Sequence, residues 1–114
     1  MAEDVLSAMS RELVLDVSAT KNLARVETRR IGMHGGLAAG LHIHNCPVVG
    51  SIVAGTVAFQ IEGQPETVLK PGDVFFEPEG VRIARFDALD EDVVFLAHYL
   101  LADNEDPVLT FPEH

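Results

Sequence analysis

Cysteine and long apolar runs are both scarce in this chain. A single cysteine, Cys46, cannot form an internal disulfide, and its isolation agrees with a reducing compartment. The longest nearly unbroken apolar run, Val93–Leu101, is far shorter than the roughly 20 residues needed to cross a bilayer. The N-terminus lacks the order of basic, apolar and small residues that marks a secretory signal. We therefore expect a cytoplasmic protein.

Positive charge is scarce as well, and this disfavours two classes of partner. Eight lysines and arginines face 18 aspartates and glutamates, so the formal net charge is −10. A surface of this sign repels phosphate backbones and anionic lipid, so we expect neither nucleic acid nor membrane as a partner. The excess of carboxylates is also explained by solubility alone.

A helical period is missing, and short alternating segments take its place. Such segments, separated by turn residues at a spacing of roughly 8 to 12 residues, are typical of an all-β sandwich or barrel. The expected strands are 13–17, 23–33, the histidine-bearing segment that opens at Gly40, 56–62, 66–70, 74–77, 81–86 and 93–101.

The length of 114 residues suits one domain that buries a core of its own. We expect a single domain over 1–114, with a barrel core over about 13–101 and an acidic C-terminal tail over 102–114. The tail contains Val108, Leu109 and Phe111, which are apolar enough to dock on the body.

Two histidines mark the candidate site. His42 and His44 are two residues apart, and side chains of a strand alternate between faces, so both imidazoles leave the backbone on the same side. This spacing predicts a pair of metal ligands. The alternative is two barrel-lining histidines that neighbours or water satisfy.

Two groups of residues extend this pattern. The first is Gly40, His42, His44 and Gly55, and the second is Gly72, Asp73, Pro78 and Gly80. With these spacings the chain, over about residues 26–101, resembles the cupins, in particular small single-domain conserved-barrel proteins of cupin type 2. The resemblance implies an all-β double-stranded β-helix, or jelly-roll barrel, with a small-molecule site in its lumen and a homodimer formed through sheet edges.

The ligand positions of this family are only half filled here. Val48 stands where many cupins have a glutamate, and Ile83 stands where they have a further histidine. A subgroup lacks that glutamate, yet its three histidines are still enough for an open Zn, Fe, Mn or Ni site. Two histidines alone bind a metal weakly. The site therefore holds either one divalent transition metal or none.

Cys46 and His98 are the candidates for a third ligand. Cys46 would share the face of His44 if the strand continued, giving a thiolate suited to Zn or Cu. Pro47 argues against this, because it would end the strand and leave Cys46 as a small buried apolar residue. His98 lies in an apolar strand that could reach the lumen, or it is a core histidine that a backbone carbonyl satisfies.

Arg85 and Tyr99 are the candidates for holding a ligand. By alternation Arg85 shares the face of Ile83, so its planar fork would reach the cavity and bind a carboxylate. The alternative is an ion pair at the barrel rim with Asp87 or Glu77. Tyr99 would add a hydroxyl group to the lumen.

Two functions fit these residues. The first is a metal-dependent enzyme, for which the resemblance implies dioxygenase-type or isomerase chemistry on a small molecule. The second is a metal-free barrel that binds or senses a small ligand, and a purely structural dimer is a further alternative. Glu62 and Glu77 are available carboxylates, but alternation does not tell whether either points inward. No catalytic residue and no substrate therefore follow from the sequence.

Overall fold

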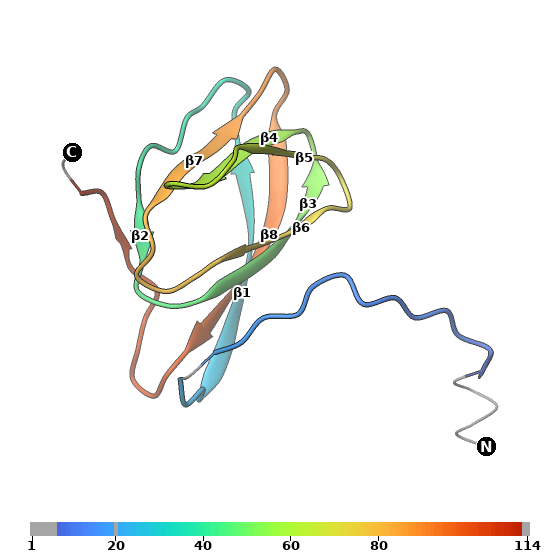
Figure 1. Cartoon of the computed structure of the whole chain (residues 1–114), viewed down its shortest axis with the longest axis vertical. Helices are drawn as coiled ribbons and strands as arrows, with labels where there is room; N and C mark the ends of the chain where they lie inside the picture. The colour runs from blue at the N-terminus through green and yellow to red at the C-terminus, as the bar shows by residue number, and fades with distance from the viewer. Residues whose placement is uncertain (1–6, 20, 113–114) are drawn as a thin grey trace.

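Nine strands make up the body of the chain in the computed structural model, which describes residues 7–19 and 21–112. In order they are β1 (Arg25–Met33), β2 (Ile43–His44), β3 (Val48–Ala54), β4 (Val57–Ile61), β5 (Thr67–Leu69), β6 (Val74–Glu77), β7 (Ile83–Ala88), β8 (Val93–Leu101) and β9 (Leu109–Thr110). Figure 1 shows how they wrap around one interior. In the part of the chain described, no helix is long and apolar enough to cross a membrane.

Two antiparallel sheets enclose the core. The larger has the order β1-β8-β3-β6 and the smaller β5-β4-β7, while β2 and β9 form a separate pair (Figure 1). The sheets meet through phenyl rings. Phe75 of β6 and Phe95 of β8 both pack against Phe86 of β7, with ring centroids 5.0 and 4.8 Å apart. The predicted all-β jelly-roll fold is confirmed.

One of the two inner strands of the larger sheet is β8. It pairs with β1 on one side and β3 on the other, and its residues alternate between buried and half-buried. The inward side chains are Val93, Phe95, Ala97, Tyr99 and Leu101. Because both edges of β8 are hydrogen-bonded, this strand does not need a partner subunit to cover it.

Residues 13–17 do not form the strand that their alternation predicts. Leu13 is 79 % exposed and Val14 is 61 % exposed, and Figure 1 shows this segment leading away from the sheets. Alternation describes side-chain polarity, but a strand also needs a neighbour to take its backbone hydrogen bonds. No described strand pairs with this segment, so the barrel begins at β1.

A β-bulge in β7 changes the direction of one predicted site residue. Arg85 and Ile83 pair with consecutive residues of β4, so Ala84 between them has no partner. An extra residue of this kind breaks the alternation of faces. Ile83 is therefore fully buried, whereas Arg85 is exposed.

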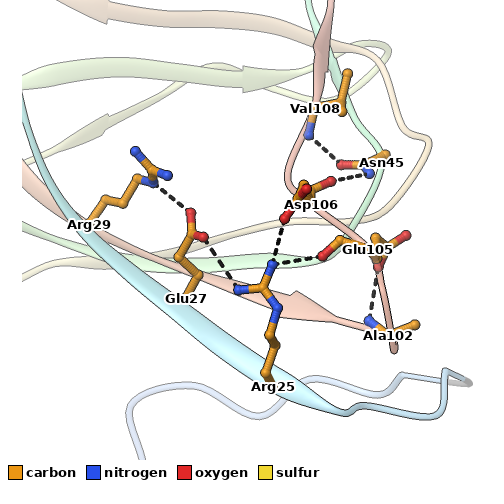
Figure 2. Close-up of polar contacts among 8 residues, drawn as sticks. All are labelled: Arg25, Glu27, Arg29, Asn45, Ala102, Glu105, Asp106 and Val108. Carbon is orange, nitrogen blue, oxygen red and sulfur yellow. Dashed lines mark hydrogen bonds and ion pairs between the residues drawn. The ribbon is translucent and has the colours of Figure 1, made fainter.

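The C-terminal segment folds back onto the barrel, where β9 pairs with β2. The side chain of Asn45 holds the approach to β9: its Oδ1 accepts a hydrogen bond from the Val108 N–H (2.7 Å), and its Nδ2 donates to the Asp106 carbonyl (2.8 Å). The Arg25 guanidinium donates to the Asp106 carboxylate and to the Glu105 carbonyl, both at 2.8 Å (Figure 2). These contacts fix the segment against the end of the barrel that carries the histidines.

Candidate metal centre

The two histidines project inward from adjacent positions on the barrel wall. His42 exchanges backbone hydrogen bonds of 3.1 and 2.8 Å with Ile83, and His44 ends β2. Both side chains are buried. Their ring planes are perpendicular, with centroids 5.2 Å apart. The rings therefore share one face, as their spacing predicts.

A buried carboxylate completes the group. Glu77, the last residue of β6, is 3 % exposed, and its Oε1 lies 2.8 Å from His44 Nε2 and 3.2 Å from His42 Nε2. One possible ligand atom from each of the three residues lies within 4.8 Å of the others. Glu77 is two residues from Phe75, so the alternation of a strand places both side chains on the same face. Both are buried in β6, and this spacing is the signal by which the sequence could have revealed Glu77.

His42 directs its Nε2 at the carboxylate of Glu77. Its Nδ1 lies 2.8 Å from the carbonyl oxygen of Gly40, and because a carbonyl only accepts, Nδ1 carries the proton. Ligating histidines usually have their second nitrogen held in this way. Gly40 has a φ of +82°, a conformation that favours glycine. The chain turn before His42 thus orients the imidazole.

Two imidazoles and one carboxylate fit a divalent transition metal. Sets of this kind occupy three coordination positions and leave others open, as in catalytic zinc and non-haem iron sites. Because Nδ1 of His42 is held by the Gly40 carbonyl, Nε2 is the nitrogen that would coordinate a metal, after losing the proton that it shares with Glu77. Glu77 is therefore a possible third ligand that the sequence did not locate.

Without an ion, the same residues form a charged pair. Burial raises the pKa of Glu77, but hydrogen bonds from His42 and His44 outweigh burial and leave that pKa below its ordinary value of 4.5. Burial lowers the pKa of His42, but hydrogen bonds with Glu77 and the Gly40 carbonyl outweigh it and leave that pKa above 6.5. Both shifts favour the pairing of an ionised Glu77 with a protonated His42 in the metal-free group.

An otherwise apolar cavity of about 270 Å³ adjoins these residues. Tyr99 is the fourth polar side chain of its wall, and its ring centroid lies 6.2 Å from that of His44. Leu109 and Phe111 of the C-terminal segment also line it, and Phe111 packs 6.4 Å from His42 between ring centroids. The rest of the wall is Ile31, Gly32, Met33, Leu37, Ala39, Val48, Phe86, Phe95 and Ala97. A concave apolar hollow with a few converging polar groups is typical of small-molecule sites.

Neither sequence-based candidate for the third ligand lies in this group. The chain bends after His44, so Cys46 is fully buried in the hydrophobic core, where burial raises its pKa to about 11. His98 is on the outer face of β8, and its Nδ1 lies 2.8 Å from Oγ1 of Thr28. Cys46 is thus a core residue, and a hydroxyl rather than a backbone carbonyl satisfies His98.

Of the two sequence-based candidates for ligand binding, Tyr99 and Arg85, only Tyr99 lines the cavity. Arg85 does not enter the cavity, because the bulge at Ala84 turns it outward to pair with Asp87 at 3.3 Å and with Glu66 at 3.9 Å. The alternative of a rim ion pair with Asp87 is the one that the structure shows.

No family model and no curated protein matches this chain by sequence, but solved structures match its fold. The DMSP lyase DddQ from Ruegeria pomeroyi DSS-3 superposes with a TM-score of 0.67 and 31 % identity over 78 % of this chain and 45 % of that chain. Oxalate oxidase in complex with the substrate analogue glycolate gives 0.64 and 19 % over 75 % of this chain and 45 % of that chain. A cupin-like protein from Thermotoga maritima gives 0.64 and 21 % over 75 % and 65 %. The chain spans less than half the length of the lyase and of the oxidase.

Proposed function

Because the chain has the fold of the cupin superfamily, we propose that it binds one divalent transition metal through His42, His44 and Glu77 and holds a small molecule beside it. The observation that carries this proposal is the buried carboxylate of Glu77, in contact with both imidazoles. A buried carboxylate is costly unless it is paired or coordinates a metal. Three protein ligands leave coordination positions for a substrate, which a closed structural site would not.

A bound metal would act there as a Lewis acid toward a substrate oxygen or as a binding site for dioxygen. Two residues of the chain orient and polarise the site. The Gly40 carbonyl holds the ring of His42 in place through a hydrogen bond. Burial, the largest influence, raises the pKa of Tyr99, so its hydroxyl stays protonated at neutral pH and can donate a hydrogen bond to a ligand oxygen.

We propose an enzymatic role for this centre. The structural neighbours support it, since two of them are named as enzymes, a DMSP lyase and an oxalate oxidase, and part of each has this fold. The apolar wall around the polar group also supports it, because a water-poor site strengthens electrostatic interactions with a substrate.

A metal-free binding module is the second candidate. Val48 and Ile83 fill the usual ligand positions with apolar side chains. In addition, every buried side-chain nitrogen or oxygen among the described residues has a hydrogen-bond partner without the help of a metal. In this form the imidazolium of His42 and the carboxylate of Glu77 would hold the polar end of a ligand.

Metal analysis of protein purified without an affinity tag separates the two candidates. We expect about one equivalent of a transition metal per chain, and its loss in His42→Ala. The matched control is His98→Ala, which removes an imidazole from the outer face and should keep the metal. Less than about a tenth of an equivalent, both as purified and after incubation with Zn²⁺ or Fe²⁺, would leave only the binding module.

A further inference from the structure

A second hollow, of about 250 Å³, adjoins the candidate metal centre. We call it the arginine hollow. Its wall is Arg29, His44, Tyr99, Pro107, Val108 and Leu109. His44, Tyr99 and Leu109 also line the apolar cavity. The two hollows therefore lie side by side along these three side chains, one of which is a candidate metal ligand.

Arg29 lies beside the arginine hollow because of the register between β1 and β8, although its side chain stays exposed. Arg29 pairs with Ala97, and Glu27 pairs with Tyr99. Directly opposed residues lie on the same face of a sheet, and Ala97 and Tyr99 are buried. The inner face of β1 thus changes from apolar at Ile31 to charged at Arg29.

The guanidinium of Arg29 is fixed at one edge and open at the other. Its Nε donates to Oε2 of Glu27 at 2.6 Å, and Oε1 of Glu27 in turn accepts from Arg25 at 3.4 Å. Figure 2 shows Glu27 between the two arginines. Arg25 also binds the C-terminal segment through Asp106. By contrast, the terminal nitrogens of Arg29 have no hydrogen-bond partner within residues 7–19 and 21–112, and its side chain is 60 % exposed.

The charges around these hollows call for one negative charge from the ligand. A divalent ion with the Glu77 carboxylate leaves one positive charge, since ligating histidines are neutral. The linked ion pairs of Arg29 and Arg25 with Glu27 and Asp106 leave none. A monoanion therefore balances the site. The composition of the chain does not suggest an anion site, because its net charge is −10.

We propose that the ligand is a small monocarboxylate with an apolar body. Its carboxylate enters the arginine hollow, whose wall includes both His44 and Arg29, and the paired N–H groups at the free edge of Arg29 suit a planar carboxylate. Its body occupies the apolar cavity against Ile31, Met33 and Phe95. This inference rests on the proposed metal site and adds Arg29 as the residue that selects the charge of the ligand.

Calorimetric titration of zinc-loaded protein with hexanoate tests the inference. Arg29→Gln should weaken hexanoate binding about tenfold, the lower end for a hydrogen bond to a charged group, because Arg29 is partly exposed. Arg30→Gln is the matched control: Arg30 lies on the outer face of β1, opposite the half-buried Leu96, and its loss should leave hexanoate affinity unchanged. Hexanamide, which keeps the body and loses the charge, should bind the wild type and Arg29→Gln equally.

Zinc stoichiometry, measured first in each variant, distinguishes the two possible failures. If wild type and Arg29→Gln both bind about one equivalent of zinc but hexanoate binds them equally, or binds neither, the role of Arg29 is overturned and the metal site stands. If the wild type binds no zinc, the proposed function fails, and the charge balance fails with it. Should Arg29→Gln fold poorly, the comparison of hexanoate with hexanamide on wild-type protein decides: equal affinity for both overturns the inference.

Discussion

Glu77 of β6 lies directly opposite Val48 of β3 in the antiparallel register of the larger sheet. Val48 holds the position at which the family pattern has its glutamate, and opposed side chains lie on one face with Cβ atoms roughly 4.5–5.5 Å apart. The carboxylate therefore enters the same region of the barrel from the neighbouring strand.

Moving the carboxylate from Glu77 to position 48 tests whether Glu77 is the third metal ligand. Glu77→Val should lower the affinity for Zn²⁺ more than about a hundredfold, since even the loss of an outer partner of a metal ligand costs up to that factor. Adding Val48→Glu to that variant should restore part of the affinity, because the new carboxylate starts from the opposed position. Competition with a chromophoric chelator measures both. Unchanged affinity in Glu77→Val would remove Glu77 from the site.

The charged pair of His42 and Glu77 predicts a pH dependence of stability in the metal-free protein. The pKa of Glu77 is lowered, so its contribution is present above 4.5 and is lost as the pH falls through its folded pKa. The pKa of His42 is raised, so its contribution is present below 6.5 and is lost as the pH rises through its folded pKa. The difference in free energy of unfolding between wild type and Glu77→Gln should therefore be largest between pH 4.5 and 6.5.

Zinc should change the upper limit of that window. Ligating imidazoles must be deprotonated, so in saturating Zn²⁺ the stability difference is expected to keep growing above pH 6.5. Urea unfolding at a series of pH values, with and without Zn²⁺, measures both profiles. Two profiles that coincide would contradict metal binding by these groups.

Cys46 should be chemically inert in the folded protein. It is fully buried and burial raises its pKa to about 11, so a thiol reagent should react with it only after unfolding. Cys46→Ser places a hydroxyl in the apolar core and should lower the free energy of unfolding by about 1–3 kcal/mol, with the metal content unchanged. Loss of the metal in Cys46→Ser at full folding would instead make Cys46 a ligand.

The contacts of Asn45 predict which backbone amide reports on the C-terminal segment. Asn45→Ala removes the acceptor of the Val108 N–H, so hydrogen exchange at Val108 should accelerate about tenfold, the equivalent of one ordinary hydrogen bond. Gln60→Ala is the control, because Gln60 also bonds a backbone group, the Gln64 carbonyl, but in a distant hairpin. Equal acceleration at Val108 in both variants would exclude a local role for Asn45.

The homodimer that the family resemblance implies stays a prediction. The strand to supply its edge is β1, which ends the larger sheet, and Val26 on this strand is 56 % exposed. Open edge strands readily pair with a second copy. Sedimentation equilibrium should therefore give the mass of two chains, and a mass of one chain at micromolar concentration would reject the dimer.

Much of the fold is readable from the sequence because glycines mark its turns. Gly40, Gly55, Gly72 and Gly80 all have positive φ values, a conformation that other residues avoid. Their spacing, with the inward pair of histidines, therefore predicts the barrel.

What the sequence does not reveal depends on pairing between strands. The bulge at Ala84 exists only because of how β7 pairs with β4, and it turns Arg85 away from the cavity. Residues 13–17 alternate but find no neighbouring strand. The inward direction of Glu77 is encoded in the two-residue spacing from Phe75, yet its role depends on the histidines of another strand. Arg29 likewise comes to line the arginine hollow through its register with Ala97.

The packing of Phe111 beside His42 matters for how the protein is produced. An affinity tag of several histidines joined shortly after Phe111 would bring further imidazoles near this ring contact, where they could compete for the ion. Protein prepared for metal quantification should therefore carry a removable affinity tag at the N-terminal side, or no tag.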